Sequence, residues 1–408
     1  MLQQVAQLLW VLCVTVPAPD AILVQNPPAI PALAVVWLAS ALRGCKVVVD
    51  WHNLGYTVLA ENTLHAKHPI VYVARLYEKL FGCHLHAHLC VTRSFQSWLE
   101  REWGIAASVL YDKPPDFFCR TGLEKQHELF TRLSANFTDV ELRAFGRPAQ
   151  QNETLFTRKN RNGTIEPHPS RPALLISSTS WTPDEDFGLL LDALVWLDGS
   201  WGQGKTLSSP ALPSSGGQAQ QSLPQLVVVV TGKGPQRAMY ESKIAAMNLR
   251  FVTVKTMWLE AADYPLLLGS ADLGVCLHTS TSNLDLPMKV VDMFGCGLPV
   301  CAVHFDCLSE LVKHDFNGLV FSNSDQLASQ IDSLLQSFPS DTTTLDRLAD
   351  GVGEFQQCRW QQNWDECARP HFTEARRSNR GWLLMLVRCL LCTVLSAVNA
   401  DCAHGGNR

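Results

Sequence analysis

The sequence predicts an α/β protein of two domains, each built around a parallel sheet. Short apolar runs that suit buried strands alternate with segments of helical periodicity, and this alternation is typical of parallel sheets. A stretch rich in Asn, Thr, Arg and Pro at 135–171 interrupts the alternation, and 408 residues are enough for two hydrophobic cores. We therefore expect two Rossmann-like domains that face each other across a cleft.

The first domain is expected at 1–134, and the polar stretch at 135–171 is expected to be a linker. Apolar, β-branched runs predict the strands, and amphipathic periodicity predicts the helices, the last but one capped by Ser94. The strands are expected at 21–24, 46–50, 88–92 and 108–111, and the helices at 30–42, 69–81, 94–103 and 123–133. Four strands are few for a Rossmann-like sheet, so this domain is predicted to be incomplete, as if its first β/α units were absent.

The second domain is expected at 172–340, followed by a C-terminal helix at 341–366 and an atypical tail at 367–408. Its strands are expected at 173–178, 225–231, 250–254, 272–278, 299–303 and 319–321, and its helices at 187–197, 236–247, 263–270, 287–294, 307–314 and 325–338. A segment rich in Ser, Pro, Gly and Gln at 208–222 predicts a surface insertion within this domain.

The second domain carries a pattern that suits a nucleotide ligand. The helix that begins near Pro287 places Lys289 and Asp292 three residues apart, so both side chains share one helix face. A lysine can hold a phosphate, and a carboxylate can accept hydrogen bonds from a ribose diol. An ordinary surface ion pair is the alternative. The buried strand that runs into the glycine turn TGKGP at 231–235 favours the nucleotide, because open α/β sheets bind ligands at the carboxyl ends of their strands.

Three neighbouring motifs have competing interpretations. The segment SSTSW at 177–181 ends a strand, and its hydroxyls and amides could bind phosphate. The acids at 184–186 resemble a metal-binding Asp-x-Asp motif, but Thr182 and Pro183 before them favour a helix start with Thr182 as the cap. The segment GSWGQGKT at 199–206 matches a phosphate-loop pattern, but it follows a helix rather than a strand, so an ATPase is rejected.

The first domain offers a candidate general base. Asp50 and His52 lie at the carboxyl end of a predicted parallel strand, where they would point towards the interdomain crevice. There a base could deprotonate a sugar hydroxyl, and a histidine with a pKa near neutrality suits that task. The alternative is a histidine that donates to a loop carbonyl, and the residues alone leave both interpretations open.

No metal site is expected from the histidines and cysteines. His84, His86 and His88 would share one face of an extended segment, but a zinc site would need further ligands that are not evident nearby. Cys389 and Cys392 form a pair of zinc-ligand spacing without a second pair. A polar strand face and an ordinary apolar tail are the favoured interpretations.

Composition excludes some classes of protein. A net charge of −5 without a basic stripe argues against nucleic acid as a partner. The fourteen cysteines are dispersed, which favours a reducing compartment, so the glycosylation motifs at Asn136, Asn152 and Asn162 are interpreted as accidental. The apolar segments 8–16 and 382–398 are short of the ~20 residues that a membrane span needs, although the second could form a membrane-surface helix or a non-native tail.

Taken together, these motifs resemble the chitobiosyldiphosphodolichol β-mannosyltransferase family of N-glycan assembly. The resemblance runs from about residue 21 to about residue 364. The segments that carry it are DWHNLGY at 50–56, CVT at 90–92, VLYDKP at 109–114, SSTSWT at 177–182, TGKGP at 231–235 and DLPMKVVDMFGC at 285–296.

The resemblance implies a GT-B fold and an inverting transfer of mannose without a metal or other cofactor. GDP-mannose would be the donor, and dolichyl-diphosphate chitobiose would be the acceptor, at the cytosolic face of the endoplasmic reticulum membrane. The membrane surface and other early N-glycan mannosyltransferases would be partners. The base would be His52, slightly preferred, or Asp50. The donor-binding residues would be Ser180, Trp181, Gly232, Lys233, Gly234, Asp285, Lys289 and Asp292.

The chain departs from the family pattern in three places. It begins after the family's membrane anchor and first strand-turn-helix, and its sequence after Trp364 no longer resembles the family. Related retaining transferases carry two glutamates around the donor, whereas Asp285 and Asp292 stand near those positions here. An inactive isoform, or one that binds only the donor and acts as a binding partner, is therefore the alternative function.

Overall fold

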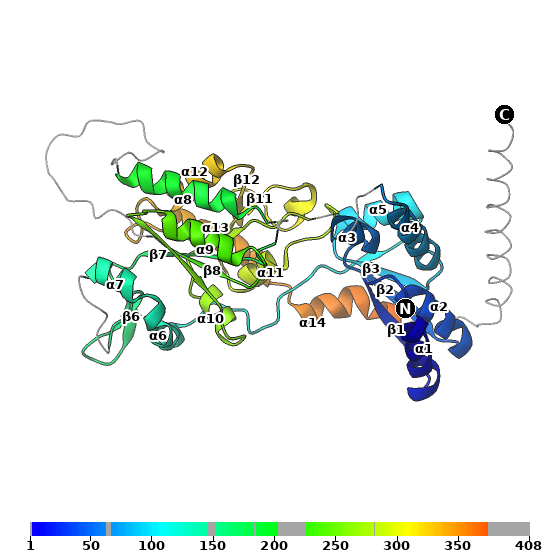
Figure 1. Ribbon diagram of the computed structural model, residues 1–408. Helices are drawn as coiled ribbons and strands as arrows, with labels where there is room; N and C mark the ends of the chain where they lie inside the picture. Colours follow the sequence, from blue (N-terminus) through cyan, green and yellow to red (C-terminus); the bar gives the residue numbers. More distant parts are fainter. Residues whose placement is uncertain are drawn as a thin grey trace, which may run out of the picture. The chain divides into compact units, whose positions relative to one another are not determined.

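The computed structural model describes residues 2–62, 67–145, 152–182, 185–202, 226–280 and 282–373. The chain divides into two compact units, and unit 2 is the continuous stretch Tyr111–Asn363 (Figure 1). Unit 1 combines Met1–Leu110 with the segment that begins at Trp364. The polypeptide thus leaves unit 1 once and returns to it near the end of the described chain.

Unit 1 is built on a four-stranded parallel sheet in the order β1-β2-β3-β4. The strands are β1 (Ala21–Asn26), β2 (Lys46–Trp51), β3 (Ala87–Cys90) and β4 (Ser108–Val109). The helices that precede or connect them are α1 (Leu2–Trp10), η1 (Val11–Thr15), α2 (Ala32–Arg43), α3 (Gly55–Asn62), α4 (Pro69–Gly82) and α5 (Arg93–Trp103). The four predicted strands are confirmed, whereas α3 was not predicted.

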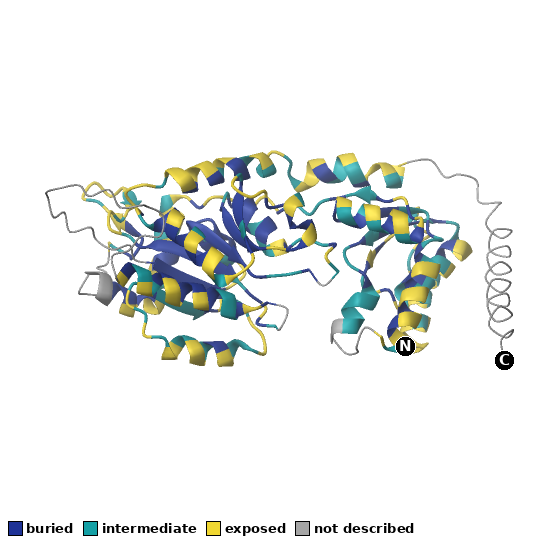
Figure 2. Ribbon diagram, turned by 90° about the horizontal axis from the view of Figure 1, so that it is seen from above, coloured by how far each residue is buried: buried dark blue, intermediate teal, exposed yellow. Residues whose placement is uncertain are grey.

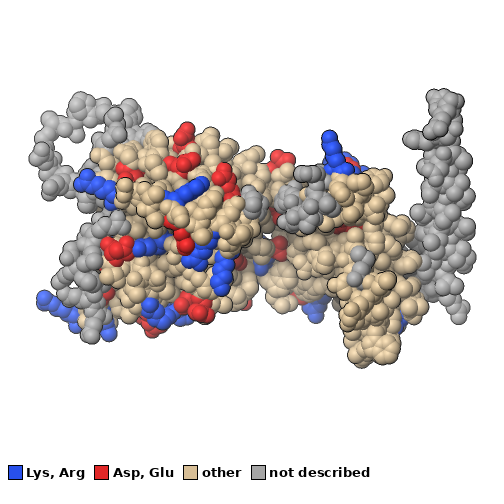
Figure 3. Space-filling view, in the orientation of Figure 1, with Lys and Arg blue, Asp and Glu red and all other residues tan. Residues whose placement is uncertain are grey.

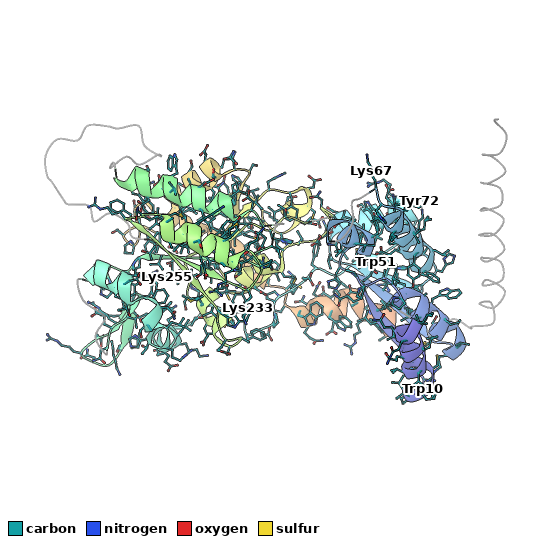
Figure 4. The ribbon with its side chains drawn as sticks, viewed as in Figure 1. Trp10, Trp51, Lys67, Tyr72, Lys233 and Lys255 are labelled. Atoms are coloured by element: carbon teal, nitrogen blue, oxygen red, sulfur yellow. The ribbon has the colours of Figure 1, made fainter. Side chains whose placement is uncertain are left out.

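The two faces of β2 bury different parts of unit 1. Trp51, labelled in Figure 4, is fully buried and packs edge-on against Phe95 and Trp103 of α5. A Cβ atom on Gly82 of α4 would lie 2.8 Å from the Trp51 ring, so only glycine lets the helix approach this closely. On the opposite face, Val48 belongs to a cluster that includes Ala368 from the returning segment.

Unit 2 contains a six-stranded parallel sheet in the order β12-β11-β10-β7-β8-β9. The order matches a doubly wound Rossmann sheet, in which the chain changes direction between β7 and β10. Ligands of such sheets bind where the carboxyl ends of these two strands diverge. The strands are β7 (Ala173–Ser178), β8 (Leu226–Thr231), β9 (Val252–Met257), β10 (Leu273–Cys276), β11 (Val300–Val303) and β12 (Gly318–Phe321).

Helices cover both faces of this sheet, and its strands are the buried centre of the unit (Figure 2). One face packs against α8 (Phe187–Gly202), α9 (Arg237–Ala246) and α12 (Ser324–Leu335). The other packs against α10 (Asp263–Leu268) and α11 (Met288–Gly295). Because β8 is buried over its whole length, its uninterrupted valine run is what a parallel strand covered on both faces requires.

The predicted linker at 135–171 is wrong for its described residues. After α6 (Leu123–Arg132), the chain forms η2 (Ser134–Asn136), α7 (Thr138–Phe145) and an antiparallel hairpin of β5 (Thr157–Lys159) and β6 (Ile165–Pro167). Phe130, Phe137 and Phe156 pack against one another in the core of unit 2. Phe137 and Phe156 stand in a mostly polar stretch, so the composition gave no sign that it packs into unit 2. The boundary between the units is at Leu110 rather than near 134.

Two predicted helix details are also corrected. The cap of α5 is Thr92, because its Oγ1 accepts the amide of Phe95 at 2.9 Å, and Ser94 lies inside the helix. The predicted helix at 307–314 is only a 3₁₀ turn, η3 (Asp306–Glu310).

The predicted C-terminal helix at 341–366 is wrong as a single helix, because the structure breaks it into shorter segments before the chain returns to unit 1. The side chain of Asn363 donates from Nδ2 to the Tyr111 carbonyl at 2.6 Å and so ties the two boundary residues of unit 2 together. The pieces are α13 (Thr343–Gln356), α14 (Trp360–Asn363) and η4 (Trp364–Ala368), and α15 (Pro370–Thr373) follows them.

Two further observations bear on membranes and on nucleic acid. Among the described residues, no helix has the length and apolar character needed to cross a bilayer. In the view of Figure 3, basic and acidic side chains are interspersed over unit 2 rather than gathered into a basic stripe. The predicted segments 203–206, 208–222 and 382–398, and the cysteines Cys389 and Cys392, lie outside the described residues.

Candidate functional site

In unit 2, the loops that follow β7 and β8 are packed backbone against backbone. The amide of Thr179 donates to the carbonyl of Thr231 at 2.9 Å. A Cβ atom on Gly232 would lie 1.8 Å from the Thr179 carbonyl oxygen, and one on Gly234 would lie 1.8 Å from that of Ser180. Gly232 also has a φ of 139°, which side chains rarely tolerate. The TGKGP turn therefore forms a preorganised loop pair with the SSTSW segment.

Trp181 holds this loop pair from inside the core. Its side chain is buried, stacks obliquely on Phe187 and Tyr240, and donates from Nε1 to the Gly232 carbonyl at 3.3 Å. The structure thus places Trp181 beneath the site, whereas Ser180 is partly exposed on the loop above it.

Glu185 is a functional candidate that the sequence interpretation missed. Its side chain is almost fully buried, and its Oε1 forms an ion pair with Lys289 Nζ on α11. Its Oε2 accepts the Ser180 amide at 2.9 Å and the Thr179 hydroxyl. One carboxylate therefore joins the loop after β7 to the helix that follows β10, at the switch point of the sheet.

A helix does begin after the acids at 184–186, as predicted, but the predicted capping residue is wrong. Asp186 Oδ1 accepts the Gly188 amide at 3.0 Å, and α8 begins at Phe187, so Asp186 rather than Thr182 caps the helix. Its neighbour Glu185 faces the site. The sequence signal for Glu185 was its position between the serine-rich loop and Asp186. It was missed because helix capping was a sufficient explanation for all three acids at 184–186.

On α11, the two residues predicted to share a face differ in environment. Lys289 is held by Glu185, whereas Asp292 lies where burial raises the pKa of its carboxyl group to about 7. Burial raises the pKa of the Tyr264 hydroxyl, and the nearby charge of Asp292 raises that pKa further. The hydroxyls of Tyr264 and Ser178 are 3.1 Å apart. Polar groups from β7 and α10 therefore lie near Asp292 of α11.

Asp285 lies in the turn before α11, and Lys233 belongs to the TGKGP turn of the loop pair. Asp285 Oδ1 accepts hydrogen bonds from the hydroxyls of Ser280 and, at 3.2 Å, Ser282, which shapes the turn before α11. Lys233, labelled in Figure 4, is exposed, and its Nζ lies 3.8 Å from the centre of the exposed Trp258 ring at the end of β9. This cation–π contact holds the Lys233 side chain beside the carboxyl edge of the sheet.

Unit 1 carries its own group of candidate residues at the end of β2. His52 Nε2 and Asp50 Oδ2 are 2.8 Å apart, and the side chain of His52 is one-third exposed. The other oxygen of Asp50, Oδ1, is buried without a hydrogen-bond partner among the described residues. In the neutral tautomer that donates from Nε2 to Asp50, His52 has its lone pair on Nδ1, and an imidazole oriented in this way by a carboxylate has the chemistry of a general base.

The three histidines at 84–88 each have a separate structural partner. His84 Nδ1 lies 2.6 Å from the Leu80 carbonyl, His86 accepts the Val47 amide, and His88 accepts from Trp51 Nε1 at 3.2 Å. Burial lowers the pKa of His88 to about 4, which keeps it neutral. Within the described part of the chain, no group of three potential ligands is placed to hold a metal ion.

Comparison with known proteins shows the family of this chain. A family model described as "Glycosyl transferases group 1" matches residues 216–343. The human chitobiosyldiphosphodolichol beta-mannosyltransferase is 45% identical over 374 residues, covering 90% of this chain and 75% of that protein. The chain belongs to this β-mannosyltransferase family. The Dictyostelium discoideum member is 38% identical, covering 84% of this chain and 68% of its own.

One relative of this family carries a different kind of name. The Arabidopsis thaliana protein named UDP-glycosyltransferase TURAN is 49% identical over 381 residues, covering 91% of this chain and 80% of that protein. Its name refers to a uridine nucleotide, whereas the sequence resemblance implies GDP-mannose as the donor.

Solved structures support the fold of this β-mannosyltransferase. Anabaena HepE in complex with UDP superposes with a TM-score of 0.58 at 16% identity, covering 89% of this chain and 80% of that one. A Rickettsia africae glycosyltransferase gives a TM-score of 0.53 at 12% identity. The protein is therefore a glycosyltransferase of the GT-B fold, as the sequence predicts.

Proposed function

We propose that this protein transfers mannose from GDP-mannose to dolichyl-diphosphate chitobiose with inversion, forming a β-mannosyl linkage. The supporting observation is the 45% identity to the human enzyme over 374 residues, a stretch longer than either unit. The match therefore extends into both units, including the predicted base and the predicted donor site. The relatives' name supplies the acceptor and the β linkage.

Unit 2 would bind the donor through the carboxyl edge of its sheet. Lys289 and Lys233 supply positive charge for the diphosphate, and Asp292 accepts hydrogen bonds from the ribose diol. Asp285 shapes the turn that precedes the Lys289 helix. Charge that grows on GDP as the sugar leaves is offset by these lysines, so the proposal requires no metal.

Unit 1 would supply the base. His52 Nδ1 takes the proton of the acceptor hydroxyl as that oxygen bonds to the anomeric carbon. The bond between this carbon and the β-phosphate oxygen breaks at the same time, and its electron pair leaves with GDP. Asp50 holds the other ring nitrogen of His52 and stabilises the imidazolium that forms. The geometry favours His52 over Asp50 as the base, because the second Asp50 oxygen is buried.

A membrane-bound acceptor suits one surface of unit 1. Ile70, Val73, Leu76 and Leu80 recur along one stripe of α4 and are exposed, as is the neighbouring Tyr72 labelled in Figure 4. We infer that this stripe faces the cytosolic leaflet of the endoplasmic reticulum, where the dolichol chain is anchored. Other early N-glycan mannosyltransferases are the proposed partners at that surface.

A donor-competition assay tests the proposal. The full chain is given lipid-linked chitobiose with GDP-mannose, UDP-glucose or UDP-N-acetylglucosamine, and calorimetry measures GDP and UDP binding. Mannosyl transfer from GDP-mannose alone is the expected result. Transfer from a UDP-sugar would replace the donor assignment. GDP binding without transfer would favour the donor-binding isoform instead.

A further inference from the structure

Unit 1 contains a buried carboxylate that the proposed reaction does not use. Glu78 of α4 has no exposed surface, yet its side chain carries three hydrogen bonds. Its Oε1 accepts Asn26 Nδ2 at 2.6 Å and the Gly55 amide at 2.8 Å, and its Oε2 accepts the Tyr56 amide at 3.0 Å. The last two donors are the first amides of α3, so Glu78 caps that helix from a different element.

The partner of Glu78 holds the other end of the same loop. Asn26 ends β1, and its main-chain oxygen accepts the amides of His52 at 2.9 Å and Asn53 at 3.3 Å. Its side-chain Nδ2 donates to the Asn53 carbonyl at 3.0 Å as well as to Glu78. The loop from His52 to Tyr56 is therefore fixed at its start by Asn26 and at its end by Glu78.

This arrangement requires a carboxylate rather than a neutral side chain. All three partners of Glu78 are N–H donors, so an amide or a protonated acid would set a donor against a donor at one position. Burial nevertheless raises the pKa of Glu78, because an ion is costly to remove from water. A buried carboxylate at position 78 lowers the stability of the fold, so its presence indicates a role other than stabilisation.

We propose that Glu78, together with Asn26, is a positioning residue that fixes the 52–56 loop so that the His52–Asp50 pair meets the acceptor hydroxyl. The inference rests on the proposed function, and it adds two residues that touch neither donor nor acceptor. Displacement of a catalytic group by about 1 Å can cost on the order of 10²-fold in rate, so a loosened loop would be visible in turnover.

The test compares Glu78→Gln with Glu100→Gln in the full chain. Glu100 is an exposed glutamate on α5 of the same unit, so the control makes the same chemical change without a network. For Glu78→Gln we expect kcat for mannosyl transfer to fall about 10- to 100-fold. Affinity for GDP should stay within about twofold, and Tm should stay within a few degrees, because a costly charge is lost together with its hydrogen bonds. The control should match the unsubstituted protein in all three measurements.

A double variant separates positioning from a merely structural role. If Glu78 acts through His52, Glu78→Gln should lower turnover by less than about twofold in a His52→Ala background. An equal loss in both backgrounds would overturn the inference, and so would a lower Tm with unchanged turnover per folded molecule. Full transfer by His52→Ala alone would show instead that the base assignment is wrong.

A second variant guards against misfolding of Glu78→Gln. Asn26→Ala removes the side-chain link between Glu78 and Asn53 but keeps the main-chain acceptor for His52. A fall of about fivefold in kcat with unchanged GDP affinity is expected, since half of the network remains. Unchanged kcat in a folded Asn26→Ala protein would overturn the role of Asn26.

Discussion

Each unit holds one loop of candidate functional residues with a buried glutamate, but the two glutamates have different partners. Glu78 in unit 1 accepts three uncharged N–H groups, and among the described residues it forms no ion pair. Glu185 in unit 2 accepts a hydroxyl and an amide and also pairs with Lys289. The first positions backbone, whereas the second positions a charged side chain that is proposed to meet the ligand.

The difference teaches how substitutions at the two places should behave. Removing Glu78 disturbs only the geometry of unit 1, so donor binding should be spared. Removing Glu185 changes the net charge beside the proposed diphosphate, so donor binding should respond. The predictions below test this contrast, from the largest expected effect to the smallest.

Lys289→Ala should have the largest effect, lowering mannosyl transfer on the order of 10²–10³-fold, because the lysine offsets charge that grows on the leaving GDP. It also leaves Glu185 buried without its cation, which destabilises the fold. The double variant Lys289→Ala with Glu185→Gln removes the unpaired buried charge. We expect it to recover Tm but not transfer, as measured by thermal melting and a radiolabel transfer assay. Unchanged transfer in Lys289→Ala would disprove the donor assignment.

His52→Ala should lower transfer by at least ~10²-fold, the lower range for a lost acid or base group. GDP affinity, measured by calorimetry, should stay within a few-fold because the donor residues lie in unit 2. Asp50→Asn is the companion variant, and it should lower transfer while leaving the imidazole in place. Retained turnover in both variants would remove this loop from the mechanism.

Glu185→Gln should lower kcat about tenfold, because Lys289 is no longer held in one geometry. GDP affinity should rise several-fold, since a carboxylate that repels phosphate has been neutralised. Glu260→Gln, an exposed glutamate of the same unit, is the matched control and should change neither quantity. Weaker GDP binding by Glu185→Gln would contradict the contrast with Glu78.

Asp292 gives the smallest and most specific signal. With a pKa raised to about 7, its carboxyl group is largely protonated at pH 6.5. A ribose diol donates to the ionised form, so GDP binding at that pH should release about half a proton or more. Calorimetry in two buffers of different ionisation enthalpy measures this release, and GDP affinity should rise as the pH rises through 7. Asp292→Asn should abolish both effects, whereas proton uptake on binding would contradict the ribose assignment.

The raised pKa of Asp292 also fixes the direction of a stability effect. The folded protein holds this proton more tightly than the unfolded chain does, so stability falls as the pH rises from the ordinary value of 3.8 towards about 7. In Asp292→Asn, Tm should depend less on pH across this window, with the variant relatively more stable at its upper end.

Local pattern was sufficient for the strands and for part of the site. The valine run of β8 and the glycines at 232 and 234 predict a buried strand and a tight turn, because both depend on residues adjacent in the sequence. Lys289 and Asp292 were found for the same reason, as near neighbours on one helix. Their placement on α11 is confirmed, and their roles in donor binding remain predictions.

Contacts between distant residues could not be predicted in this way. Glu185 and Lys289 are 104 positions apart, and Asn26 and Glu78 are 52 apart. Each glutamate has an ordinary local interpretation, one at a helix start and one on an amphipathic helix. The hairpin after α6 was missed because its few aromatic anchors are separated by polar residues. Only the tertiary fold shows which of these side chains converge.

The two-segment make-up of unit 1 has a consequence for how the chain is completed during synthesis. A nascent chain of 363 residues already contains every strand of unit 2. The face of unit 1 around Val48 and Leu89, however, lacks Ala368 and its neighbours, which cover it in the finished protein. Unit 1 is therefore synthesised first but completed last. Its apolar face around Val48 stays uncovered until the chain beyond Trp364 has left the ribosome.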